Sequence, residues 1–330
     1  MKKIAALCIF SLIIPFSLVA EDKQSIDAPG DELSRGQVLA LTGLSLGSNL
    51  ATIFEIGLLT DSQMADFDFP WWMIATVATH HLPLYYLDSR KALSFSLPDA
   101  ALIGGYVAAK KWPLLASVPF NLFAYDEFYS TYQIYMTARN RTSSGTYLSY
   151  PETHTRGDLL IAPFEWQNIS DPLFYTTVLA TSAVQVFTAL RSEDAIWRTG
   201  EAWIDGTKYS PGAGMSYMAA ANLVKYAATA VGEEALYRGV VYEELRSSIG
   251  PTKAKLVDML LFPAIHIPTD IARGKSLANI GIQFGIRLCT TLLFDFAYDR
   301  GGLPLSTAIH TWFNFIAETM AWAKSSGVSL

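Results

Sequence analysis

The sequence predicts an all-α protein, a polytopic membrane bundle of about eight helices, some of them short or broken. Hydrophobic residues make up 51% of the 330 residues and charged residues only 16%, whereas ordinary soluble domains carry roughly 25% charged residues. Several apolar runs approach the roughly 20 residues that a membrane-spanning helix needs. These runs are too long and continuous for barrel strands, so helices are the remaining way to satisfy the backbone in lipid.

The chain begins with a segment typical of a secretory signal peptide. In residues 1–20, MKKIAALCIFSLIIPFSLVA, Lys2 and Lys3 precede an apolar core, and the small residue Ala20 precedes a polar stretch. This order of basic, apolar and small residues is the pattern that signal peptidases process. An uncleaved anchor is the alternative. Residues 21–36 then form a polar linker.

Eight apolar runs are candidates for the membrane helices. In chain order they are 37–59, 70–87, 100–125, 171–190, 213–231, 256–267, 276–298 and 303–323. The run 100–125 is interrupted by Lys110, Lys111 and Pro113, and the run 256–267 ends at Pro268. Residues 37–165 are assigned to N-terminal membrane helices and loops, and residues 166–330 to a C-terminal helical core.

Charge and cysteine content argue against a nucleic-acid partner, a disulfide framework and a cysteine zinc site. The net charge of −6 and the absence of a basic arm argue against a nucleic-acid partner. The two cysteines, Cys8 and Cys289, both lie in apolar runs. They form neither a disulfide framework nor the spacing of a zinc site.

The stretch GEEALYRG, residues 232–239, places three charges at the end of an apolar run. An ionisable group at the centre of a membrane helix costs about 2.5–3.5 kcal/mol, so such groups are candidates for function. On a helix, Glu234 and Arg238 lie four residues apart and can form an ion pair. Glu233 is rotated by about 100° from Glu234 and stays outside that pair. A buried glutamate without a cation is suited to act as a general base near neutral pH.

Two further pairs of residues are also spaced by four. Phe262 and His266 lie in FPAIHIP, and His310 and Asn314 lie in HTWFN. A glutamate, two histidines and an asparagine from three helices could together hold a water, a carbonyl and its developing oxyanion.

Each of these pairs alone is a weak signal. A single histidine on an apolar helix is more often a satisfied core residue or one that faces a loop. His80, His81 and His154 are interpreted in this way, and Arg287 and Asp295 are interpreted as structural or interfacial.

Taken together and in order, the three motifs resemble a known family. EEALYR matches E-E-x-x-x-R, FPAIH matches F-x-x-x-H, and HTWFN matches H-x-x-x-N. They look like the CPBP family of intramembrane proteases, which includes CAAX prenyl endopeptidases and bacteriocin-processing and immunity-type proteins. The similar part covers about residues 213–323, and the N-terminal two-thirds shows no resemblance.

The resemblance implies a catalytic core that hydrolyses a peptide bond in a membrane-associated protein or peptide. The implied catalytic set is Glu233, Glu234, Arg238, His266, His310 and Asn314. Glu233 would activate water with help from His266, and His310 and Asn314 would stabilise the oxyanion. The choice of Glu233 over Glu234 as the base rests on helix geometry and family precedent together.

A metal is an open alternative. Glu233, His266 and His310 could supply a two-histidine, one-carboxylate zinc site, and no other cofactor is implied. Because HExxH is absent, a metal-independent glutamate mechanism is favoured.

Two other classes of function compete with a peptidase. One is a non-catalytic protein of the same fold that binds a membrane partner or confers immunity. The other is a transporter, which the absence of internal repeats disfavours. The expected partners are a membrane-associated substrate and the lipid bilayer, and the expected location is a bacterial inner membrane, crossed several times.

Overall fold

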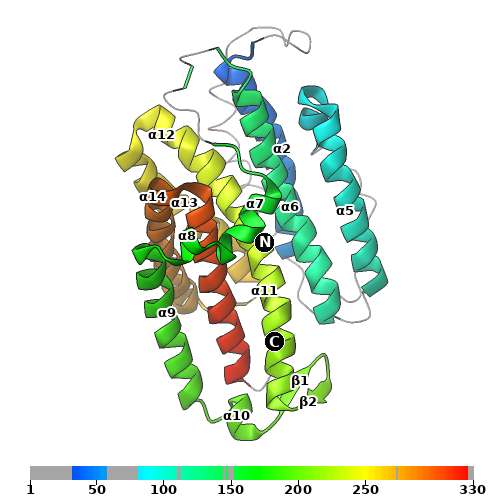
Figure 1. Cartoon of the computed structure of the whole chain (residues 1–330), viewed down its shortest axis with the longest axis vertical. Helices are drawn as coiled ribbons and strands as arrows, with labels where there is room; N and C mark the ends of the chain where they lie inside the picture. The colour runs from blue at the N-terminus through cyan, green and yellow to red at the C-terminus, as the bar shows by residue number, and fades with distance from the viewer. Residues whose placement is uncertain are drawn as a thin grey trace.

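The computed structural model describes residues 32–57, 81–109, 113–143, 146–147, 152–272 and 274–325, which are mostly helical (Figure 1). The predicted signal peptide and most of the predicted helix 70–87 lie outside the described residues. The division of the chain at residue 165 stays a prediction.

The N-terminal helices agree only partly with the predicted runs. They are α2 (Arg35–Gly57), α5 (Ser89–Ala109) and α6 (Pro113–Arg139), with a further helix at 81–87. α2 corresponds to the predicted helix 37–59. The predicted run 100–125 covers the end of α5 and the start of α6, and the predicted interruption at Lys110, Lys111 and Pro113 lies between them. Proline favours the first position of a helix, where its missing N–H costs nothing.

The C-terminal helices follow the predicted runs more closely. They are α7 (Arg156–Ile161), η1 (Ala162–Phe164), α8 (Trp166–Ile169), α9 (Pro172–Arg191), α10 (Ile196–Thr199), α11 (Pro211–Leu236), η2 (Tyr237–Tyr242), α12 (Glu243–Ile249), α13 (Pro251–Ala272) and α14 (Leu277–Lys324). α13 continues through Pro268, so the predicted end of that helix is wrong. A proline removes one backbone hydrogen bond, and the packing of α13 along α14 outweighs that loss.

α14 contains both of the last two predicted helices. It bends where Gly301 and Gly302 leave helical backbone angles, Gly302 with φ of 68°. A positive φ is accessible to glycine at no steric cost. The parts of α14 before and after these glycines therefore run in different directions.

A small hairpin departs from the predicted all-α fold. β1 (Ala202–Ile204) pairs antiparallel with β2 (Thr207–Tyr209). Asp205 and Gly206 between them have φ values of 46° and 72°, as a two-residue hairpin turn requires. The hairpin lies beside α10 at the lower end of the molecule (Figure 1).

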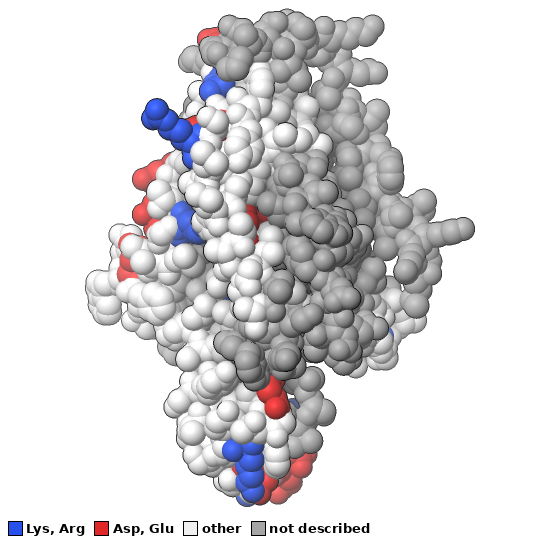
Figure 2. Space-filling view, turned by 90° about the vertical axis from the view of Figure 1, so that its right-hand side faces the viewer, with Lys and Arg blue, Asp and Glu red and all other residues white. Residues whose placement is uncertain are grey.

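Two stretches are long and apolar enough to cross a membrane, Pro172–Thr199 and Leu277–Lys324. Only 22% of the most apolar window of each is buried, which is unlike the core helix of a soluble protein. Large apolar side chains of α9 lie exposed, namely Leu179, Val184, Phe187 and Leu190. Figure 2 shows charged side chains toward the upper part and at the lower tip of the described surface, with a mostly uncharged stretch between them.

α6 and α11 pack closely against each other at Gly232. A Cβ atom on Gly232 of α11 would lie 2.6 Å from the Tyr125 carbonyl oxygen of α6. Real Cβ atoms essentially never come so close to a backbone atom. The absence of a side chain at this position sets the spacing of the two helices.

Gly232→Ala should therefore destabilise the protein. We expect the free energy of unfolding to fall by about 1–3 kcal/mol, as for other overpacked cores, measured by thermal and denaturant unfolding in detergent. Gly281→Ala in α14 is the control, because a Cβ there meets nothing within 4 Å. Equal stability of the two variants would contradict the close contact.

Candidate active site

The first motif lies where α11 changes its helical geometry. Glu233 and Glu234 occupy the last turn of α11, and Arg238 lies in the π-helical segment η2 that follows without a break. All three residues are buried. Segments of π-helix are rare and often occur at functional sites. The sequence pattern gave no indication of this one.

Arg238 is the centre of a buried ionic cluster. Its Nη1 lies 3.2 Å from Glu234 Oε1, so the predicted ion pair is present. Its Nε donates to Asp295 Oδ1 at 3.1 Å and its Nη2 to the Thr291 carbonyl at 3.1 Å. Asp258 Oδ2 lies 3.7 Å from Nη2. Side chains from α11, η2, α13 and α14 thus meet at one guanidinium.

His310 is held between the two glutamates. Its Nδ1 is 2.7 Å from Glu234 Oε1 and its Nε2 is 3.5 Å from Glu233 Oε2. Its ring stacks on Phe294, with centroids 4.4 Å apart. Because Glu234 also pairs with Arg238, it is an acceptor, and the hydrogen bond fixes the His310 proton on Nδ1. The ring therefore turns Nε2 toward Glu233.

Phe262 lies between His266 and His310. Its ring contacts Phe262 edge-on with centroids 5.1 Å apart, and Phe262 lies 6.3 Å from the His310 ring. His266 is half-buried on α13. One turn later, Asp270 pairs with Arg287 of α14 and fixes this end of α13.

Asn314 lies one turn after His310 on α14 and is half-buried. Within the described contacts it makes no hydrogen bond to the other predicted site residues. The structure thus joins Glu233, Glu234, Arg238 and His310 by direct contacts. It places His266 nearby, and the described hydrogen bonds do not link Asn314 to them.

The alternative zinc ligands do not converge. Among the described residues, one group of His, Cys, Asp and Glu side chains has ligand atoms that all lie within 4.8 Å of one another, and it does not contain Glu233, His266 or His310. A tetrahedral zinc site needs ligands about 2 Å from the ion. The positions of Glu233, His266 and His310 do not meet that requirement.

Sequence reasoning missed part of the ionic cluster. The sequence analysis does not include Asp258 among the site residues. Asp258 lies four residues before Phe262 and so shares its helix face. Asp295 was interpreted as structural, and its contact with Arg238 is consistent with that role. An aspartate inside an apolar helix is costly, and this cost was the signal that could have marked Asp258 as a residue of the site.

A cavity of about 740 Å³ opens beside η2 and the bend of α14. Its lining includes Gly239, which follows Arg238, and Gly301 and Gly302. Glu152, His154 and Asp158 also line it. A polar hollow therefore lies next to the segment that carries Arg238.

Comparison with known families assigns this part of the chain. Residues 216–316 match the family model for type II CAAX prenyl endopeptidase, Rce1-like, and the predicted resemblance is confirmed. The matched range contains the whole predicted catalytic set, from Glu233 to Asn314. No curated protein and no solved structure gives a significant match.

Removing the charge of Arg238 should leave buried carboxylates without a counter-ion. We expect Arg238→Met to lower the free energy of unfolding by about 3–5 kcal/mol, measured by denaturant unfolding in detergent. The control is Lys208→Met, which breaks an exposed pair with Glu201 and should cost about 1 kcal/mol or less. Similar losses in both variants would show that Arg238 does not hold the cluster together.

Proposed function

Since residues 216–316 match the family model for type II CAAX prenyl endopeptidase, Rce1-like, we propose that the protein is an intramembrane endopeptidase. It hydrolyses a peptide bond in a membrane-associated protein or peptide by means of a glutamate-activated water. One observation carries this proposal. His310 lies between Glu233 and Glu234, and one of these glutamates is held by Arg238 while the other is not.

A single proton explains how Glu233 and His310 work together. Nδ1 of His310 carries a proton toward Glu234, and its Nε2 faces Glu233 Oε2. In this proposal one further proton moves between Nε2 and Glu233. When that proton is on Nε2, Glu233 is a carboxylate base and His310 is a cationic donor. Their separation of 3.5 Å agrees with the looser geometry of sites without substrate.

The reaction then follows from these roles. Glu233 takes a proton from water as the water oxygen attacks the peptide carbonyl. Nε2–H of His310 and the Asn314 amide donate to the resulting oxyanion. Glu233 returns its proton to the leaving amine as the C–N bond breaks. His266, close to His310, positions the water, and no step requires a metal.

The surface supports a location in the membrane. The exposed apolar faces of α9 and α14 suit contact with lipid tails. The charged hairpin end and the charged upper part then lie at the two polar interfaces. We assign the protein to a bacterial inner membrane that it crosses several times, and its substrate to the same membrane.

Glu233→Gln should abolish cleavage without unfolding the protein. Loss of a general base lowers the rate by about 10²–10⁴-fold, and glutamine keeps the shape of the side chain. The test compares protein termini in membranes of cells that express wild type or the variant at equal abundance. Glu318→Gln, exposed on the same helix as His310, is the control. Unchanged termini in Glu233→Gln would favour the non-catalytic, partner-binding alternative.

The two glutamates should differ in what they stabilise. Glu234→Gln removes a carboxylate shared by Arg238 and His310, so it should lower the melting temperature as well as the activity. Glu233→Gln should leave the melting temperature near that of wild type. Thermal unfolding of both variants in detergent measures this, and the reverse order would assign the base to Glu234.

A further inference from the structure

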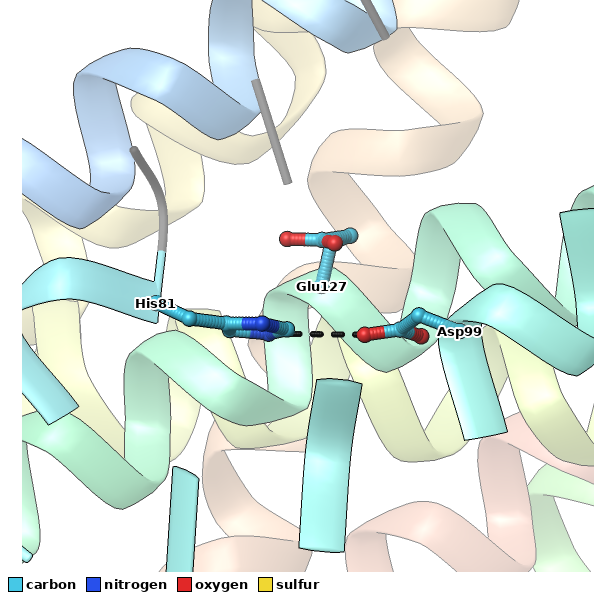
Figure 3. A group of neighbouring side chains, drawn as sticks. All are labelled: His81, Asp99 and Glu127. Carbon is cyan, nitrogen blue, oxygen red and sulfur yellow. Dashed lines mark ion pairs between the residues drawn. The ribbon is translucent and has the colours of Figure 1, made fainter. Parts of the chain in front are cut away.

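The geometry points to a second polar site, outside the matched domain, which binds a divalent transition-metal ion through His81, Asp99 and Glu127. His81 lies in the helical residues 81–87, Asp99 on α5 and Glu127 on α6. In Figure 3, His81 and Asp99 reach toward each other and Glu127 rises between them. We propose Zn²⁺ as the ion.

The spacing of the three side chains suits a metal. Each offers one ligand atom, and these atoms all lie within 4.8 Å of one another. His81 Nε2 is 3.4 Å from Asp99 Oδ2. Two ligands bound about 2.05 Å from zinc at the tetrahedral angle are about 3.3 Å apart. A zinc ion could therefore bind between His81 Nε2 and Asp99 Oδ2 with little movement of the two side chains.

The orientation of the His81 ring is the strongest argument. Its Nδ1 lies 3.0 Å from Ser96 Oγ, and that hydroxyl donates to the Ala92 carbonyl at 3.1 Å. A serine hydroxyl has one proton, so it accepts from Nδ1–H. Nε2 then turns a lone pair toward Asp99 Oδ2, 3.4 Å away. A lone pair beside a carboxylate oxygen is stable when a cation lies between them.

Burial adds to the need for a cation. His81 and Asp99 are 0% exposed and Glu127 is 3% exposed. Two carboxylates this deep are costly unless charge compensates them. Arg156, which lies in the same region, is paired with Asp126 at 2.6 Å. Two carboxylates and a neutral imidazole balance the charge of a divalent ion.

The ligand types select the class of metal. Imidazole favours zinc and other transition metals over Mg²⁺ and Ca²⁺, and carboxylates are compatible with zinc. The Nδ1 contact with Ser96 resembles the outer hydrogen bond that orients most metal-bound histidines. Because the ligands come from three helices, the ion fastens the helix at 81–87, α5 and α6 together.

The test is the metal content of the purified full chain. Elemental analysis of the protein in detergent should find about one zinc per chain. Asp99→Asn and Glu127→Gln should each lower this by roughly tenfold or more. His154→Ala, at a histidine outside the cluster, should keep the zinc. Zinc retained in Asp99→Asn and Glu127→Gln but lost in Glu233→Gln would overturn the proposal and assign the metal to the catalytic domain.

A second measurement covers variants that fold poorly. A chelator should lower the melting temperature of wild type, and added Zn²⁺ should restore it. The melting temperature of Asp99→Asn should not respond to either. If wild type contains no metal and ignores the chelator, the carboxylates instead share protons and the proposal is wrong.

Discussion

The buried charge of Arg238 is the constraint on which the arrangement of α11, α13 and α14 depends. A guanidinium stays protonated in any protein environment, so its burial requires carboxylates around it. Glu234, Asp258 and Asp295 supply them from α11, α13 and α14. These helices must therefore converge on one point, and water is excluded there. The same requirement fixes Glu234 as an acceptor and thereby orients His310.

The bend of α14 follows from this convergence. Asp295 and His310 are 15 residues apart on one helix, a distance of about 22 Å if the helix were straight. Yet Asp295 contacts Arg238, and His310 contacts the Glu234 that pairs with Arg238. Two side chains cannot span that length, so the chain must turn between them. Gly302, with its positive φ, provides the turn.

The parts of this site that sequence predicted are those fixed by local geometry. Glu234 and Arg238 are one helical turn apart, so their pairing needed only the assumption of a helix. The contact of His310 with Glu233 joins α14 to α11 and depends on the bend, which no periodicity reveals. Among the helices, long apolar runs such as α9 and α11 were predictable. The interruption of the run 100–125 at Lys110, Lys111 and Pro113 was also predictable, because charges and a proline are unfavourable inside an apolar helix.

The cluster around Arg238 and the group of His81, Asp99 and Glu127 solve one problem in different ways. In each, carboxylates from different helices are buried close together, and their negative charges repel one another unless a positive charge compensates them. The cluster around Arg238 contains its own permanent cation. His81, Asp99 and Glu127 include no such group, and the Zn²⁺ that we propose there would supply a positive charge. α6 connects the two clusters, because Glu127 follows two residues after the Tyr125 carbonyl against which Gly232 packs. An ion that fixes α6 also fixes the surface on which the Glu233 helix rests.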